Sequence, residues 1–299
     1  MNEFELIDEI VRVLGEVTEG PSVVVGPGDD SAALRVPEGQ LLISSIDALV
    51  SGVHFPETAD PHLIGYRAIM VSVSDLAAMG AEPAQILVAL TFEPTDADWV
   101  IGLASGMREA TIECGARLVG GNLALGARAI TVSVHGFCPA DVLLTRTGAG
   151  VGDALFVTGE LGAAAAALRT GALTDQRRKL SAAASAYFRP KARVSEGILL
   201  RGVATAAIDV SDGLLQDLDH LCTASGVGAM IQSASLPVAS GAELADALSG
   251  GDEYELLFTA SCNLSDLPVA ATQIGSITGA PGVQLDGQPV DPVGYRHFS

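Results

Sequence analysis

Aspartates in short, glycine-flanked runs are the feature that most limits how this chain can fold. Most of these runs adjoin apolar, strand-like segments, where an unpaired carboxylate near the core is costly. The chain has only two lysines, so few ammonium groups are available as partners. We therefore expect the fold to gather the aspartates around hard divalent cations. The seven aspartates are Asp29, Asp30, Asp47, Asp75, Asp209, Asp212 and Asp252.

Length and charge narrow the possible partners. The 299 residues suffice for two domains of ordinary size. A formal net charge of -20 argues against nucleic acid or an anionic membrane surface, and an anionic substrate could bind only with metal ions neutralising its approach. No apolar run is long enough to span a bilayer, so no membrane segment is predicted. Four separated cysteines without a C-x-x-C pair indicate reduced thiols in a cytoplasmic protein.

Hydrophobic patterns predict alternating helices and strands. A helix is predicted over about residues 2–14, and strands at 23–25, LLISSID, QILVALTF and AITVSVHGF. A second helix begins with Asp60 as N-cap and Pro61 as its first residue, and stops at Gly80. The spacing is not that of a TIM barrel, so we expect α/β folding with mixed sheets. A glycine-dense stretch near residues 140–150 predicts two domains, 1–142 and 143–299.

The run VVVGPGDDSAAL resembles the start of a dinucleotide-binding unit, but three features oppose that interpretation. Pro27 separates the glycines, Ser31 replaces the third glycine, and two carboxylates stand where a pyrophosphate would lie. The alternative is an acidic β-turn. Neither a P-loop nor a protein-kinase motif set is present, so any phosphoryl transfer uses another apparatus.

Two later runs are more specific. Asp75 follows a helical pattern close to the end of that helix, where the dipole disfavours a carboxylate. Asp209 ends a predicted strand, and Ser211 and Asp212 open the next helix. Such a helix start offers backbone N–H groups to phosphate oxygens, and Ser211 would also be an ordinary N-cap.

Taken together, the runs resemble the thiamine-monophosphate kinase family in order and approximate spacing over essentially the whole chain. The matching segments are GPGDDSA, SSIDALVSGVHF, SVSDLAAMGAEP, RLVGGN, TRTGAGVGD, AIDVSDGLLQDL, SGGDEYELLF and GYRHF. The resemblance implies the two-domain architecture of the aminoimidazole-ribonucleotide synthetase superfamily, with ATP and Mg²⁺ at the N-terminal domain, and a cytoplasmic homodimer. It also implies an enzyme that phosphorylates thiamine monophosphate to thiamine diphosphate with ATP. Whether K⁺ assists is left open.

The resemblance also implies a site. It assigns metal binding to Asp30, Ser45, Asp47, Asp75, Asn122, Asp209 and Asp212. It assigns ATP binding to Ser105, Gly121, Asn122, Arg146 and Ser211, and substrate binding to His54, Asp252 and Tyr295. No catalytic side chain is expected, because the attacking phosphate oxygen is already ionised and several Mg²⁺ ions would reduce the repulsion between the two anions.

Four positions depart from the family's pattern. Asn122 stands where an aspartate is usual, which predicts a weaker metal site, and Ile46 replaces a hydroxyl residue beside Asp47. The acidic pair of SGGDEYE is reversed, so either Asp252 or Glu253 could face the substrate. Ser105 occupies a place where relatives can carry an aromatic residue.

Two alternatives remain, and Asn122 and Ile46 support the second. The first is another ATP-using synthetase of the same superfamily. The second is a catalytically weakened member that binds metal or nucleotide. Incubation with ATP and thiamine monophosphate, followed by product identification, distinguishes them.

Overall fold

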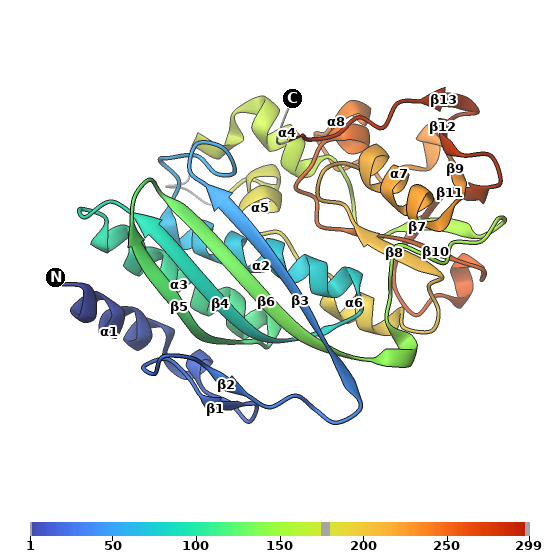
Figure 1. Ribbon diagram of the computed structural model, residues 1–299. Helices are drawn as coiled ribbons and strands as arrows, with labels where there is room; N and C mark the ends of the chain where they lie inside the picture. The colour runs from blue at the N-terminus through green and yellow to red at the C-terminus, as the bar shows by residue number, and fades with distance from the viewer. Residues whose placement is uncertain (1, 175–179, 297–299) are drawn as a thin grey trace. The chain divides into compact units, whose positions relative to one another are not determined.

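A computed structural model describes residues 2–174 and 180–296. Its chain forms two compact units (Figure 1). The N-terminal unit comprises residues 1–76 and 82–140, and the C-terminal unit comprises residues 77–81 and 141–299. A short 3-10 helix, Ala140–Val142, lies where the chain passes from one to the other.

The N-terminal unit is built on a four-stranded sheet. Its strands, in spatial order, are β3 (Gln40–Val50), β6 (Ala129–Pro139), β4 (Glu82–Phe92) and β5 (Arg117–Leu125). β4 and β5 are parallel, and the other pairs are antiparallel. The remaining elements are α1 (Glu3–Leu14), a 3-10 turn (Gly15–Thr18) and the two-stranded ribbon of β1 (Val23–Val25) and β2 (Ala33–Leu34).

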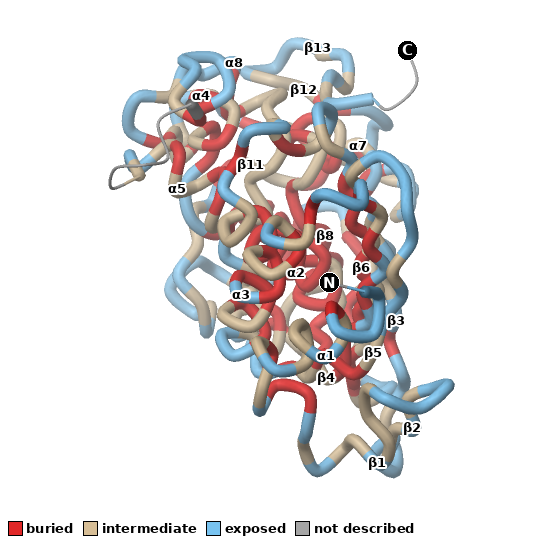
Figure 2. The backbone as a smooth tube through the Cα atoms, turned by 90° about the vertical axis from the view of Figure 1, so that its left-hand side faces the viewer, coloured by how far each residue is buried: buried red, intermediate tan, exposed pale blue. Residues whose placement is uncertain are grey.

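Two long helices, α2 (Pro61–Ala78) and α3 (Ala97–Cys114), cover one face of this sheet and lie behind it in Figure 1. Odd-numbered residues of β3 point to this covered face, and the register pairs them with buried valines and isoleucines of β6 and β4. Most of α2 is buried, as Figure 2 shows. α2 is therefore a helix buried on nearly all sides, and its apolar residues are not confined to one stripe.

The opposite face of the same sheet is open. Leu42, Ile46 and Val50 of β3 are exposed there, with Leu87 of β4. Alternation along a strand places these residues on the side away from α2. The N-terminal sheet thus has one dry face and one apolar face turned to solvent.

The C-terminal unit contains a mixed, seven-stranded sheet. Its strands, in spatial order, are β13 (Gln288–Val290), β12 (Gly282–Leu285), β9 (Gly228–Ile231), β11 (Thr272–Thr278), β7 (Ala154–Val157), β10 (Leu256–Ala260) and β8 (Ala206–Asp209). Its helices are α4 (Ala163–Thr170), α5 (Ala182–Phe188), α6 (Val194–Leu199), α7 (Leu214–Ser225) and α8 (Leu244–Ser249), with 3-10 turns at Ala172–Thr174, Ser233–Ser235 and Leu264–Asp266.

Both faces of this second sheet are buried at its centre. Leu155, Val157 and Ile208 pack in one core with apolar residues of α7 and α8. Phe156 and Phe258 pack in a second core on the other face, with their rings stacked at 5.3 Å. Strands covered on both sides are apolar throughout, which is why β8 and β10 show no polar alternation.

Most elements agree with the patterns of the sequence. The strand at 23–25 and the helix starting at Pro61 have the predicted starts, and α2 ends two residues before Gly80. No described helix combines the length and apolarity needed to cross a membrane.

Candidate functional site

Two carboxylates approach each other on the covered side of the N-terminal sheet. Asp47 comes from β3 and Asp75 from the last turns of α2, close enough for the charge of Asp75 to act on Asp47. Ser45, on the same side of β3 as Asp47, donates from its Oγ to Asp75 Oδ2. Ser72, one turn before Asp75, hydrogen-bonds Asp47. A strand and a helix that are distant in sequence thus form one acidic cluster.

The electrostatics of this cluster favour a cation. Burial, and then the charge of Asp75, raise the pKa of Asp47 to about 6, against the hydrogen bond from Ser72. None of the groups that shift this pKa within the described chain is an arginine or a lysine. Two carboxylates and a hydroxyl are hard oxygen ligands of the kind that Mg²⁺ accepts. The donor set of Ser45, Asp47 and Asp75 therefore fits Mg²⁺.

This cluster leaves room for further ligands. Over residues 2–174 and 180–296, no three histidine, cysteine, aspartate or glutamate side chains group so as to hold a metal ion by themselves. Asp30, the third acid predicted for this unit, is exposed in the loop between β1 and β2, where its N–H donates to Asp29 Oδ1 at 2.8 Å. An ion at the pair would therefore take phosphate oxygens or water as well.

Asn122 does not join this pair within one chain. It lies on β5, paired with Ala89 of β4 on the open face of the sheet, whereas Asp47 lies on the covered face. β6 and β4 also separate its strand from β3, a distance of roughly 14 Å at the usual strand spacing. Gly121, on the covered face, has a simple packing reason, because a Cβ there would lie 2.0 Å from Val88 O.

Ser105 and His54 also lie apart from the pair. Ser105 is exposed on α3, and its Oγ is 3.2 Å from Nδ1 of His62 near the start of α2. His62 precedes Asp75 by about 20 Å of helix, at 1.5 Å per residue. His54 lies in the turn after β3, where its Nδ1 accepts the Val50 N–H at 3.0 Å. A neutral ring that accepts through Nδ1 carries its proton on Nε2, which makes Nε2 a donor.

Four predicted residues of the C-terminal unit are brought together. The Asp252 N–H donates to Ser211 O at 2.8 Å, and the Tyr295 N–H donates to Asp212 O at 2.9 Å. The loop after β8, the loop before β10 and the C-terminal segment therefore meet at one place. His297 and Phe298, the last residues of the GYRHF run, lie outside the described residues.

The expected start of α7 needs correction. Ser211 does not cap this helix; α7 begins at Leu214, and Gly213 is its N-cap. The backbone N–H groups of Ser211, Asp212 and Gly213 are engaged by Oδ2 of Asp217, at 3.0, 3.0 and 3.1 Å. Burial raises the pKa of Asp217 to about 6 despite these bonds. Asp217 thus engages the three N–H groups that immediately precede the helix.

Asp209 lies close to Ser211 in sequence, whereas Arg146 lies at the opposite end of α7. Asp209 is the buried last residue of β8, three positions before Asp212. Arg146 is exposed, and its carbonyl accepts from Ser225 Oγ at the C-terminal end of α7. Ser225 and the start of α7 are about 17 Å apart along the helix axis. The structure therefore separates Arg146 from Ser211 and Asp212.

Gln216 and Asp217, which the sequence did not single out, hold these loops. Gln216 Nε2 donates both to Asp212 Oδ2 at 2.9 Å and to Tyr295 O at 3.0 Å. Asp217 binds the three N–H groups described above. Glu253 lies beside the backbone N–H groups of Gly162, Ala164 and Ala165 at the start of α4. The capping role of Asp217 could have been recognised from the sequence, because acids in the first turn of a helix often bind nearby N–H groups. The role of Glu253 could not, because it depends on a helix that is distant in sequence.

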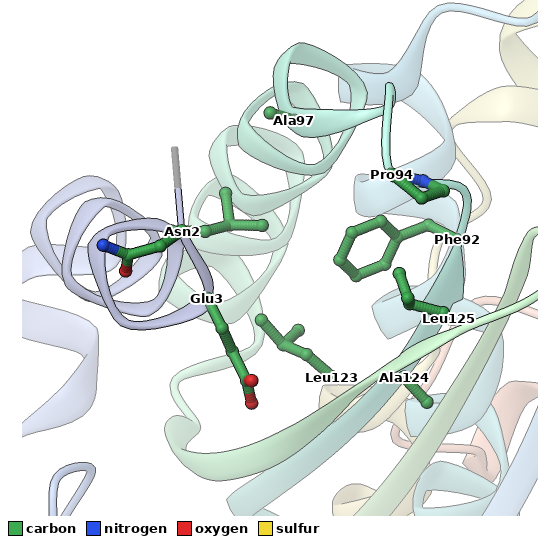
Figure 3. A pocket seen from close by; sticks show the side chains of 9 residues that line it. Asn2, Glu3, Phe92, Pro94, Ala97, Leu123, Ala124 and Leu125 are labelled. Carbon is green, nitrogen blue, oxygen red and sulfur yellow. The ribbon is translucent and has the colours of Figure 1, made fainter.

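A pocket elsewhere in the N-terminal unit contains none of these residues (Figure 3). Its walls are apolar apart from Asn2 and Glu3, and Asn2 is engaged in capping α1. The lining residues are Asn2, Glu3, Leu6, Phe92, Pro94, Ala97, Leu123, Ala124 and Leu125. The convergent polar groups of a small-molecule site are missing from this lining.

Known proteins resemble the chain over almost its full length. Residues 28–139 match the N-terminal domain of AIR synthase related proteins, and residues 150–264 match their C-terminal domain. Thiamine-monophosphate kinases of Salmonella typhimurium and Escherichia coli K12 are each 39% identical, over 93% of both chains.

Solved structures agree. The thiamine-monophosphate kinase of Stenotrophomonas maltophilia is 35% identical, with a TM-score of 0.87 over 97% of this chain and 98% of that one. The complex of AaThiL with AMPPCP and TMP is 30% identical, with a TM-score of 0.81 over 99% and 97%. These matches confirm the predicted α/β fold and two-domain superfamily architecture. The chain is a kinase, and it belongs to the thiamine-monophosphate kinase family.

Proposed function

We propose that the protein transfers the γ-phosphoryl group of ATP to thiamine monophosphate, giving thiamine diphosphate, with the help of several Mg²⁺ ions. Relatives that carry this activity in their names, and a solved relative that holds an ATP analogue together with TMP, support the choice of substrates. We place the reaction in the cytoplasm, because widely separated cysteines indicate a reducing compartment.

The observation that carries the metal-dependent part is the pairing of Asp47 and Asp75. Holding two like charges together in a half-buried place is unfavourable without a cation. Ser45 adds a neutral oxygen to the same cluster. We therefore assign metal binding first to these three residues. Bound Mg²⁺ would supply charge neutralisation for the polyphosphate.

The proposed reaction needs no general base from the protein. The nucleophile is a phosphate oxygen of the substrate, which is ionised at neutral pH, so the side chains have to bind and orient rather than remove a proton. In this proposal the Ser211 hydroxyl and the Asp209 and Asp212 carboxylates serve the metal-bound nucleotide. Arg146 offers a guanidinium fork for phosphate oxygens. Asp30 stays assigned to metal binding, and Ser105 and Gly121 stay assigned to ATP binding.

The substrate side is assigned to His54, Asp252 and Tyr295. Asp252 and Tyr295 belong to the same group of loops, where a carboxylate suits a cationic ring system and an aromatic side chain suits its face. Tyr295 is 44% exposed, which leaves its ring accessible to a ligand. His54 offers an Nε2–H donor if its tautomer is the one described above.

The test is direct product identification. Purified protein, ATP, thiamine monophosphate and Mg²⁺ should yield thiamine diphosphate and ADP, separated by liquid chromatography, and a chelator should abolish the product. Parallel reactions in K⁺ and Na⁺ buffers show whether K⁺ assists. ATP binding without product at saturating Mg²⁺ would instead support the weakened member of the family, and ATP consumption without thiamine diphosphate would support a different synthetase.

Asn122 supplies a separate test of the metal sites. An amide oxygen can bind Mg²⁺ but brings no charge, so we expect weaker Mg²⁺ binding in the nucleotide complex, and a several-fold gain in the Asn122→Asp variant. Calorimetric titration of Mg²⁺ into both proteins measures this. Because the residue lies on the open sheet face, it would share an ion with Asp47 only through a second copy of the chain. Equal Mg²⁺ affinities would remove Asn122 from the metal site.

We also propose that the protein is a homodimer that uses the open face of the N-terminal sheet. Exposed Leu42, Ile46 and Val50 form an apolar surface there, next to the edge strand β3. Exposed apolar residues on a sheet face are common at protein interfaces, and here Ser44 and His135 lie among them. Light scattering after size exclusion should give a dimer mass for the wild type and a monomer mass for Ile46→Asp, with Val36→Asp as an exposed valine control outside the strand.

A further inference from the structure

The turn that carries Asp252 has an unfavourable backbone. Asp252 and Tyr254 have φ values of 69° and 56°, and only one other non-glycine residue of the described chain, Asp286, has a positive φ. Side-chain-bearing residues rarely adopt this region, and they remain there only when the surroundings hold them. Glu253 stands between the two.

The side chain of Glu253 points into the protein. Its carboxyl group lies beside the backbone N–H groups of Gly162, Ala164 and Ala165 at the start of α4, which lower its pKa against the effect of burial. Its Oε1 is buried and has no hydrogen-bond partner among the described residues. The start of a helix is a favourable environment for an acidic oxygen. Glu253 therefore ties the turn to α4.

The neighbouring peptide groups tie the turn to the loop after β8. The Tyr254 N–H donates to Val210 O at 2.8 Å, beside the Asp252–Ser211 bond. A Cβ on Gly251 would lie 2.6 Å from Ser211 O, so the two loops are in close backbone contact. Tyr254 also donates from its hydroxyl to Asp252 Oδ1 at 2.9 Å. With Glu253 directed inward, the Asp252 carboxylate is left beside Ser211 and Tyr254.

We propose that Glu253 is a positioning residue of the thiamine-phosphate site, which acts through Asp252 and does not touch the substrate. This inference rests on the proposed function. It also assigns the two members of the reversed acidic pair: Asp252 faces the ligand, and Glu253 holds the turn. Loss of the anchor releases the left-handed conformation and moves the Asp252 carboxylate away from its place.

The experiment compares Glu253→Ala, Glu253→Gln and Asp252→Asn in steady-state kinetics with both substrates. Glu253→Ala should raise the KM for thiamine monophosphate about tenfold, equivalent to about 1.4 kcal/mol, and leave the KM for ATP within about twofold. Glu253→Gln keeps an acceptor oxygen for the α4 N–H groups and should restore most of the loss. Asp286→Asn is the matched control, because Asp286 is also left-handed and its carboxylate also binds a backbone N–H, that of Ser233 at 2.9 Å.

The double variant shows whether Glu253 acts through Asp252. If it does, Asp252→Asn combined with Glu253→Ala should be no worse than Asp252→Asn alone, since the effects of coupled residues do not add. Additive losses, an unchanged KM in Glu253→Ala, or equal changes in both KM values would overturn the inference.

Two further measurements separate the possible failures. Absence of thiamine diphosphate with the wild-type enzyme rejects the proposed function together with this inference, whereas wild-type activity with an unaffected Glu253→Ala rejects the inference alone. If Glu253→Ala folds poorly, hydrogen exchange on Glu253→Gln and the wild type replaces it. The amides of residues 162–165 and 252–254 should then stay protected in both proteins. Faster exchange of these amides in Glu253→Gln alone would show that a neutral acceptor oxygen does not hold the turn.

Discussion

The acidic residues of the two units differ in what stabilises them. In the N-terminal unit, Asp47 and Asp75 face each other, and hydroxyl groups are the polar contacts described for them. In the C-terminal unit, Asp217 Oδ2 accepts three backbone N–H groups, and the Glu253 carboxyl group lies beside three N–H groups at the start of α4. Both arrangements bury carboxyl groups, but only the second places backbone N–H groups beside them.

The difference separates ligand-binding acids from structural ones. A carboxylate whose lone pairs are filled by backbone donors has little capacity left for a metal ion. A pair of carboxylates without backbone donors is stabilised when a cation binds. We therefore expect substitutions in the two units to have opposite effects on stability and activity.

The largest effect should come from Asp75→Asn. This change removes one charge of the N-terminal pair but keeps a similar shape, so activity should fall about 100-fold or more, because the loss is of a direct ligand. The free energy of unfolding without metal should not fall. Initial rates at saturating ATP and urea unfolding in a chelator measure the two quantities. A variant that loses stability in proportion to its activity would place Asp75 with the structural acids.

Asp217→Ala should show the reverse pattern. Three buried N–H groups would lose their acceptor, which should lower the free energy of unfolding by roughly 2–4 kcal/mol. Asp217→Asn keeps an acceptor oxygen and should lose less than half of that. Urea unfolding followed by circular dichroism gives both values. Equal stability of the alanine variant and the wild type would contradict the capping role.

Glu253 predicts a specific dependence of stability on pH. Burial raises its pKa from 4.5 to about 8, against the three backbone hydrogen bonds. Between these pH values the folded chain holds a proton that the unfolded chain has released, so the free energy of unfolding falls as the pH rises. The pKa values of Asp47 and Asp217 are also raised, to about 6, so these residues affect the free energy of unfolding in the same way at pH values below about 6. Between pH 6 and 8 Glu253 should account for a loss of at most about 3 kcal/mol.

The Glu253→Gln variant removes that slope, and urea unfolding at several pH values between 6 and 8 measures it. Asp286→Asn is again the control, because the hydrogen bonds from Ser233 lower the pKa of Asp286, and its contribution is lost only when the pH falls through the acidic range. A wild-type stability that rises from pH 6 to 8 would show that the carboxyl group is ionised throughout.

The smallest effect is expected for Asp47→Asn in the absence of metal. Removing one of two repelling charges should raise the free energy of unfolding by about 1–2 kcal/mol at pH 7, although activity falls. Asp98→Asn, on the exposed first turn of α3, is the matched surface control and should change stability by less than about 0.5 kcal/mol. Thermal unfolding with and without Mg²⁺ and ATP would show the wild type gaining more from the ligands than Asp47→Asn.

The sequence predicted many of the helices and strands well, because their positions follow from the periodicity of apolar residues. The apolar run LLISSID indicated the strand that became β3, and the Asp60–Pro61 pair marked the start of α2. The order of acidic runs identified the family before any contact was known. These signals lie within short segments or in the order of segments along the chain, so they can be read without tertiary information.

The sequence could not predict which polar groups satisfy each other. The N–H groups after β8 were expected to be available, but Asp217 binds them from one turn along the same helix. Asn122 was assigned to the metal site by resemblance, and pairing with β4 places it on the face opposite Asp47. Both outcomes depend on loop conformation and register, which periodicity does not specify to a single residue.

The close backbone contact around the Asp252 turn limits how the enzyme can change in evolution. Gly250 and Gly251 leave no space for a side chain, since an added Cβ would lie 2.4 Å from Asp246 O and 2.6 Å from Ser211 O respectively. Residues on either side of Glu253 must tolerate a left-handed backbone. A lineage that acquires a new substrate would therefore keep this backbone and exchange the side chain at position 252, with Asn and Gly as the replacements that the conformation most readily accepts.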